Sequence, residues 1–212
     1  MKLGLVQQGL EALYRIDTAL AVDDFVIDTA TRDAIAPHRA PREQLLVHEQ
    51  DGELSLALFV DERSLANLVA NDPRERLDDS NFQDFLYAIE GVSHFVYVAW
   101  RARAGRSVSV LELELQAEVD KWVACLTTLW REGAPPADLI ARLFDRFQLE
   151  PGLDAVERER YLVANENART YTRALGDRFV AQGRIAELFT ELRRFYRMSG
   201  AAKLEHVGRI AA

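Results

Sequence analysis

The chain has 212 residues, of which 49% are hydrophobic and 28% charged, and its formal net charge is −8. This balance is typical of a folded globular protein, and it excludes a mainly disordered chain, a collagen-like repeat and a disulfide-stapled miniprotein. The length is enough for a substantial core, and we expect one domain over 1–212. The acidic charge disfavours nonspecific binding to nucleic acid or to an anionic membrane.

The composition predicts a cytoplasmic protein of bacterial type. Cys125 is the only cysteine, so no intrachain disulfide can form and nothing indicates an oxidising compartment. The N-terminal pattern is amphipathic and does not match a signal peptide, and no stretch approaches the roughly 20 apolar residues of a membrane span. Only Lys2, Lys121 and Lys203 are lysines among 26 basic residues, an arginine bias typical of GC-rich genomes.

Residues 1–79 are predicted to form an α+β segment. Apolar residues recur at mostly helical spacing over 5–20, which indicates a helix, and Phe25-Val26-Ile27 is typical of a short strand. Two apolar runs then flank Asp51-Gly52. Because a tight hairpin turn requires positive φ, this dipeptide predicts a β-hairpin over 43–60.

Residues 80–132 are predicted to form a helical hairpin. Apolar residues recur every three or four positions over 80–104 and again over 108–131, and a polar break separates the two helices. If the helices fold back on each other, residues at equal distances from the break face one another. Gly91 is then expected opposite Trp122, where its missing side chain accommodates the indole ring.

Residues 133–212 are predicted to add further helices, because proline and glycine residues interrupt an otherwise helical pattern. A helix ending near Gln148 is predicted after Pro135 or Pro136, and a long helix after Pro151-Gly152. Gly183 separates the long helix from the next one, and Ser199 precedes a short last helix. The predicted fold class is therefore α+β and mainly helical, with an N-terminal helix and β-hairpin followed by an antiparallel helical bundle.

Charge is unevenly distributed along the chain. Residues 1–150 contain 26 acidic and 15 basic residues, a net charge of −11, whereas residues 151–212 contain 8 acidic and 11 basic residues, a net charge of +3. We expect the basic C-terminal helices to pack against the acidic part within one cooperative unit.

Common catalytic motifs are missing from the sequence. It contains no glycine-rich phosphate loop, no HExxH, no EF-hand loop and no cysteine–histidine zinc spacing. The run Gly91-Val92-Ser93-His94-Phe95 partly matches the GxSxG nucleophile elbow. Phe95 replaces the second glycine, however, and the run lies within a helical pattern instead of following a strand, so a hydrolase of that type is disfavoured.

One cluster of residues suits a metal ion. Glu90 and His94 are four residues apart on the first helix of the hairpin, and Glu114 and Glu118 are four apart on the second, with His94 expected level with Glu118. Carboxylates and an imidazole that converge between helices form the metal sites of helical bundles. These residues are therefore candidates for a site that holds a divalent transition metal or performs acid–base chemistry.

A structural role for the same cluster is the alternative. Lys121 and Arg101 are close enough in sequence to pair with these acids, which would give a set of interhelical ion pairs and no cofactor. In addition, the spacing here is Glu-x-x-x-His, whereas di-iron bundles use Glu-x-x-His.

The C-terminal residues are candidates for binding a partner. A basic and aromatic pattern suits binding to an acidic protein surface. It also suits nucleic acid, although the acidic net charge of the chain makes that partner less favourable. The helix over 199–212 is too short to be stable alone, so it either docks on its own domain or binds a groove on another chain, such as a second copy. The candidate residues are Arg193, Arg194, Tyr196, Arg197, Lys203, Leu204, Val207 and Arg209.

Together these observations favour a noncatalytic cytoplasmic adaptor or regulatory protein that contacts another protein or a second copy of itself, with no membrane partner. The first alternative is a metal-dependent or acid–base enzyme with its site between helices 80–104 and 108–131. The second alternative is nucleic-acid binding through the C-terminal arginines.

Overall fold

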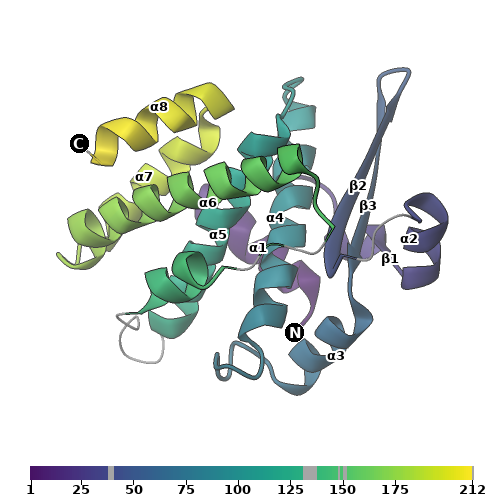
Figure 1. Ribbon diagram of the computed structural model, residues 1–212, viewed down its shortest axis with the longest axis horizontal. Coiled ribbons are helices and arrows are strands. Elements are labelled where there is room, and N and C mark those ends of the chain that lie inside the picture. Colours follow the sequence, from purple (N-terminus) through teal and green to yellow (C-terminus); the bar gives the residue numbers. More distant parts are fainter. Residues whose placement is uncertain (38–40, 131–137, 148, 150–151, 212) are drawn as a thin grey trace.

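The computed structural model describes residues 1–37, 41–130, 138–147, 149 and 152–211. Over these residues the chain has the predicted mainly helical α+β fold (Figure 1). The helices are α1 (Leu3–Tyr14), α2 (Thr29–Ile35), α3 (Glu62–Ala70), α4 (Phe82–Arg103), α5 (Val110–Trp130), α6 (Ala155–Leu175), α7 (Ile185–Arg197) and α8 (Gly200–Ala211), and the strands are β1 (Val26–Ile27), β2 (Glu43–Gln50) and β3 (Glu53–Val60). Shorter helical turns occur at Val22–Phe25, Ala141–Asp145 and Gly176–Val180.

The predicted β-hairpin and the short strand before it form one sheet. The strand order is β1-β3-β2, with β1 parallel and β2 antiparallel to β3. Asp51 and Gly52 both have positive φ, 53° and 81°, as the predicted turn requires. The register pairs Glu43 with Val60, so Glu43 lies at the base of the hairpin, where the sheet packs on α4.

Helices α4 and α5 form the predicted hairpin and occupy the centre of the molecule (Figure 1). Ile89 and Val96 on α4 are buried, as are Leu115 and Trp122 on α5. The expected contact between Gly91 and Trp122 is wrong, because Gly91 faces the sheet. A Cβ atom on Gly91 would lie 2.9 Å from Leu58 Cδ1 and 3.0 Å from Glu43 Oε2.

The C-terminal helices lie on the opposite side of the α4–α5 pair from the sheet (Figure 1). Helix α6 packs along α5, α7 contacts α1, and α8 lies on α6 and α5. The expected packing of the basic helices on the acidic part is therefore confirmed. Ala164, Ala168, Tyr171 and Leu175 on α6 are buried. The predicted ends of the helix between Pro135 or Pro136 and Gln148 fall outside the described residues.

Buried apolar side chains from all parts of the described chain form one connected core. Leu10 on α1, Leu58 on β3, Ile89 on α4 and Leu192 on α7 belong to it. The core reaches from the sheet to the C-terminal helices, so the side chains between α4 and α5 are held from several directions. No helix in the described ranges is long and apolar enough to cross a membrane.

Candidate metal centre

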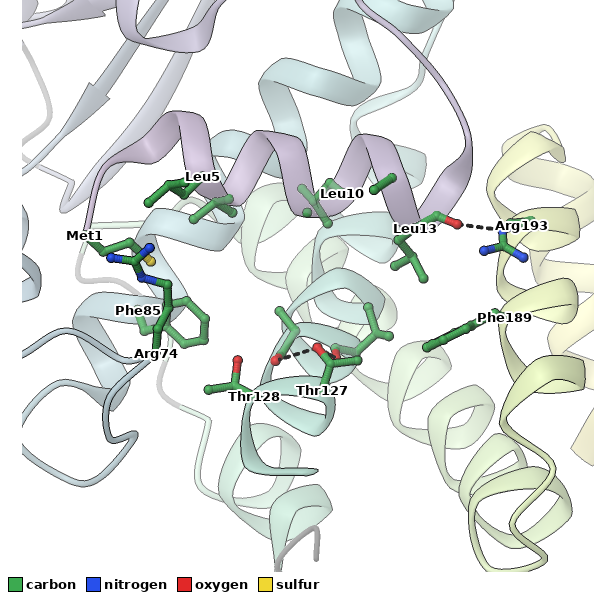
Figure 2. A pocket seen from close by; sticks show the side chains of 15 residues that line it. Met1, Leu5, Leu10, Leu13, Arg74, Phe85, Thr127, Thr128, Phe189 and Arg193 are labelled. Atoms are coloured by element: carbon green, nitrogen blue, oxygen red, sulfur yellow. Dashed lines mark hydrogen bonds between the residues drawn. The ribbon is translucent and has the colours of Figure 1, made fainter. Parts of the chain in front are cut away.

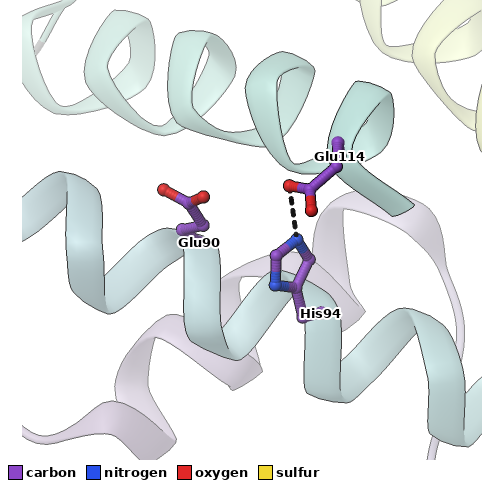
Figure 3. Close-up of side chains that lie close together, drawn as sticks. All are labelled: Glu90, His94 and Glu114. Atoms are coloured by element: carbon purple, nitrogen blue, oxygen red, sulfur yellow. Dashed lines mark ion pairs between the residues drawn. The ribbon is translucent and has the colours of Figure 1, made fainter. Parts of the chain in front are cut away.

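Three of the four predicted site residues come together between α4 and α5. Glu90, His94 and Glu114 each offer one ligand atom, and these atoms lie within 4.8 Å of one another. Figure 3 shows the His94 ring and the Glu114 carboxylate pointing toward each other, with Glu90 one helical turn away on α4. His94 Nε2 lies 3.5 Å from Glu114 Oε2.

Glu118, the fourth predicted residue, belongs instead to an ion pair beside this group. Lys121 Nζ donates a hydrogen bond to Glu118 and another of 3.1 Å to Glu90 Oε2. The expected alignment of His94 with Glu118 is therefore wrong by one helical turn: His94 meets Glu114. One end of the cluster is therefore the ion-pair network that the sequence allowed, and the other is a group of three side chains that could hold a metal ion, which stays a prediction.

Strand β2 contributes a carboxylate that the sequence analysis missed. Glu43 Oε2 lies 3.9 Å from His94 Nδ1, on the other side of the ring from Glu114. Glu43 is distant in sequence, and a polar residue at the base of a hairpin has no distinctive pattern. Gly91 was the available signal, because only a helix position without a side chain lets the strand and its carboxylate approach this closely.

Two polar atoms of the group are buried without a hydrogen bond. Within the described part of the chain, Glu43 Oε2 and His94 Nε2 have no hydrogen-bond partner, and His94 is only 5% exposed. Buried polar atoms are normally paired, because each one left unpaired costs about 1–3 kcal/mol. Each atom instead has one longer ion-pair contact, 3.5 Å from His94 Nε2 to Glu114 and 3.9 Å from Glu43 Oε2 to His94, so both could turn toward a cation bound in the same small volume.

The electrostatics of the group follow from burial and from its excess of carboxylates. Burial raises the pKa of Glu43 to about 8, and the negative charges of Glu90 and Glu114 add to this shift. Burial alone would lower the pKa of His94, but Glu114, Glu43 and Glu90 outweigh it and raise that pKa to about 9. The pKa of Glu90 is lowered despite its burial, because Lys121 and His94 lie beside it.

Tyr161 on α6 is half-buried near this group. Burial raises the pKa of the Tyr161 hydroxyl, and the negative charges of Glu114, Glu90 and Glu43 raise it further, which shows that the ring lies within the field of the cluster. Cys125 lies on α5, three residues after Trp122, and its thiol is buried. Burial raises the pKa of this thiol to about 12, as expected for an inert cysteine.

The predicted partner-binding residues are divided between the interior and the surface. Tyr196, Lys203 and Val207 are at most 2% exposed, so the prediction that they contribute to a surface patch is wrong. Lys203 Nζ donates hydrogen bonds to the Tyr97 hydroxyl at 2.9 Å and to Gln116 Oε1 at 2.6 Å. Because α8 docks on α5 and α6, these side chains are covered by their own chain.

Two of the predicted arginines bind the end of α1. Arg193 Nε donates a hydrogen bond of 2.6 Å to the Leu13 carbonyl, and Arg197 donates one of 2.9 Å to the Tyr14 carbonyl. These bonds satisfy carbonyl groups that the last turn of a helix leaves free. The remaining candidates, Arg194, Leu204 and Arg209, are exposed or half-buried, and their role in partner or nucleic-acid binding stays a prediction.

Comparison with known proteins finds no matching family, no matching curated protein and no matching solved structure. The chemistry of this site therefore rests on its own geometry. An imidazole and several carboxylates suit divalent ions of the first transition row, which accept nitrogen and oxygen ligands together.

Proposed function

We propose that the protein is a metal-dependent enzyme that binds one divalent transition-metal ion through Glu90, His94 and Glu114. The observation that carries this proposal is the convergence of one ligand atom from each of Glu90, His94 and Glu114 within 4.8 Å, with His94 Nε2 buried and only 3.5 Å from Glu114 Oε2. Two ligand atoms on one ion lie roughly 3 to 4 Å apart at bond lengths of about 2.1 Å. Ligand atoms within 4.8 Å of one another therefore need only small side-chain rotations to bind the same ion.

The charges around the group also favour a cation. The carboxyl groups of Glu43, Glu90, Glu114 and Glu118 share this buried volume with the single lysine Lys121 and with His94. Near neutral pH the raised pKa of Glu43, about 8, keeps a proton on that carboxyl group, and the charges of Lys121 and His94 face the other three carboxyl groups. Burying this many acidic groups is costly unless positive charge accompanies them. A divalent ion would supply that charge and would leave His94 neutral, as a ligand must be.

A catalytic role is favoured over a structural one by the number of ligands. Structural zinc sites use four protein ligands, whereas catalytic sites use three and keep one position for water or substrate. The side chains of Glu90 and Glu43 are 15% and 11% exposed, so the group has a route to solvent. Glu43 lies beside His94 without being one of the three ligands, where it is placed to accept a hydrogen bond from a bound water molecule.

Titration calorimetry with Zn²⁺ and with Mn²⁺ tests the metal site. We expect one ion per chain, and we expect Glu114→Gln, which keeps the side-chain shape, and His94→Ala each to weaken binding at least tenfold. His48→Ala is the matched control, because His48 is exposed on the outer part of β2. Absence of binding, or equal binding by all these variants, would refute the site; melting curves of each variant report whether the fold is intact.

Substitution with Co²⁺ tests the open coordination position. Azide added to the Co²⁺-loaded protein should change its visible absorption spectrum, because a small anion can occupy a free position on the ion. A spectrum unchanged by azide would indicate a closed, structural site and would contradict the catalytic role while leaving the metal site itself in place.

A second candidate function, a cytoplasmic adaptor, is favoured by the hairpin. The outer half of β2 and β3 projects away from the helices (Figure 1), and its apolar residues Val47 and Leu54 are 49% and 36% exposed. Strand β2 lies at the edge of the described sheet, where a further strand can pair with it. If a second copy binds there, sedimentation should show a dimer that Val47→Lys converts to a monomer; a monomeric wild-type chain would argue against this mode.

A further inference from the structure

A second site lies on the opposite face of α5 from the metal centre. Helices α1, α4, α5 and α7 surround a cavity of about 450 Å³. Figure 2 shows Leu5, Leu10 and Leu13 of α1 along one wall, with Phe85 of α4 and Phe189 of α7 facing them. Small-molecule sites have volumes of roughly 300–1,000 Å³ and mainly apolar walls with a few polar groups, and this cavity has both properties.

The arginines of the cavity lie at its ends. Arg74 lies at one end and Arg193 at the other (Figure 2). Between them, the Thr127 hydroxyl donates to the Val123 carbonyl within its own helix, so it is not a free donor for a ligand. Apart from the Thr128 hydroxyl, the middle of the cavity is apolar and favours an apolar chain, and the two ends decide which charged group can accompany that chain.

The two arginines differ in whether their charge is already neutralised. Arg74 donates three hydrogen bonds to the carboxylate of Asp72, at 2.5 to 3.1 Å. Arg193 donates only Nε, to the Leu13 carbonyl, and no carboxylate in the described part of the chain lies within ion-pair distance of it. Arg15 and Arg197 also act on Arg193 with the same sign of charge, so this end of the cavity is positively charged.

We propose that the cavity binds an amphipathic carboxylate, a fatty-acid anion, with its acyl chain along α1 and its headgroup at Arg193. The terminal nitrogens of Arg193 can donate two parallel hydrogen bonds to a carboxylate, which matches the guanidinium geometry. A bound anion also reduces the repulsion among Arg15, Arg193 and Arg197. This proposal does not depend on the metal centre, because the two sites share no residue.

Titration with dodecanoate tests the proposal. We expect saturable binding of one dodecanoate per chain and binding about tenfold weaker in Arg193→Gln, since one charge-assisted contact is lost. Arg194→Gln is the matched control: Arg194 is the next residue on α7, its side chain is 63% exposed, and it does not line the cavity. It should bind dodecanoate as the wild type does.

Because Arg193 also bonds the end of α1, Arg193→Gln could weaken binding by shifting that helix. Two further measurements do not alter Arg193. Dodecanol and dodecylamine should bind the wild-type chain at least about tenfold more weakly than dodecanoate, since they carry the same chain without the negative charge. Thr128→Phe should abolish binding by filling the cavity from α5. Equal binding of all three amphiphiles, unchanged binding by Arg193→Gln, or no binding of dodecanoate would overturn the proposal.

Discussion

The ammonium group of Lys203 donates a hydrogen bond of 2.6 Å to the side-chain oxygen of Gln116, and both residues are fully buried. Lys203 also lies over the ring of Tyr97, 4.3 Å from its centroid. The contact joins the last helix to the middle of α5, so α8 is held by polar bonds in the interior as well as by its apolar side. A buried amino group with these partners fixes the position of α8 closely, since any displacement would leave it without hydrogen bonds.

We predict that Lys203 makes the stability of the protein increase with pH between 7 and 10.5. Burial lowers the pKa of Lys203 to about 7, against the opposing effects of Glu112 and Asp120. In this range the folded chain has released the proton that the unfolded chain still binds, so raising the pH favours folding by up to about 1.4 kcal/mol per pH unit. Lys203→Met removes this effect. Urea unfolding of both chains at pH 7 and pH 9 measures the effect: from pH 7 to pH 9 the free energy of unfolding of the wild type should rise relative to that of Lys203→Met. Equal changes in the two chains would contradict the prediction.

We also predict that removal of α8 destabilises the protein strongly. Truncation after Met198 removes the buried residues Lys203, His206 and Val207 and exposes the side chains they cover. The melting temperature should fall by more than about 10 °C, because several kcal/mol of buried contacts are lost. A chain that lacks only residues 211–212 is the control. An unchanged melting temperature after truncation would show that α8 is an independent tail available to a partner, as the sequence alone also allowed.

The fold was predictable wherever a local signal determined it. Asp51-Gly52 predicts the hairpin turn because both residues must adopt positive φ, and they do. The apolar spacing over 80–104 and 108–131 predicts α4 and α5 within a few residues of their observed ends. The spacing of Glu90 and His94 on one helix face likewise predicts that their side chains point the same way.

The rest depends on packing between distant segments, which spacing does not determine. The pairing of His94 with Glu114 in place of Glu118 is set by the geometry of the connection between α4 and α5. Glu43 reaches His94 because Gly91 lets β2 pack closely on α4. Lys203 reads as a surface residue from sequence, yet it is buried because a ring of aromatic and polar groups from other helices encloses it.

Gly91→Ala should destabilise the protein even though alanine favours helix by about 1 kcal/mol. The added Cβ would lie 2.9 Å from Leu58 Cδ1 and 3.0 Å from Glu43 Oε2, and Leu58 is fully buried and has little room to move. Such overpacking costs about 1–3 kcal/mol, so we expect a net loss of about 1 kcal/mol in urea unfolding. Gly208→Ala on α8 is the control: nothing lies within 4 Å of its added Cβ, and it should be neutral or stabilising. A stabilising Gly91→Ala would show that the sheet does not pack here as described.

Metal affinity should rise with pH up to about 9. The pKa of His94 is raised to about 9 by Glu114, Glu43 and Glu90, so below that pH the imidazole holds a proton that must leave before its nitrogen can bind an ion. Each proton released on binding makes the affinity increase about tenfold per pH unit, and above pH 9 this contribution should level off. Competition with a chromophoric chelator for Zn²⁺ between pH 6 and pH 8, corrected for protonation of the chelator, measures the slope. His94→Ala should bind Zn²⁺ only weakly, and its affinity should rise less steeply with pH because no His94 proton is released. A wild-type affinity that does not change over the same range would mean that His94 is not a ligand.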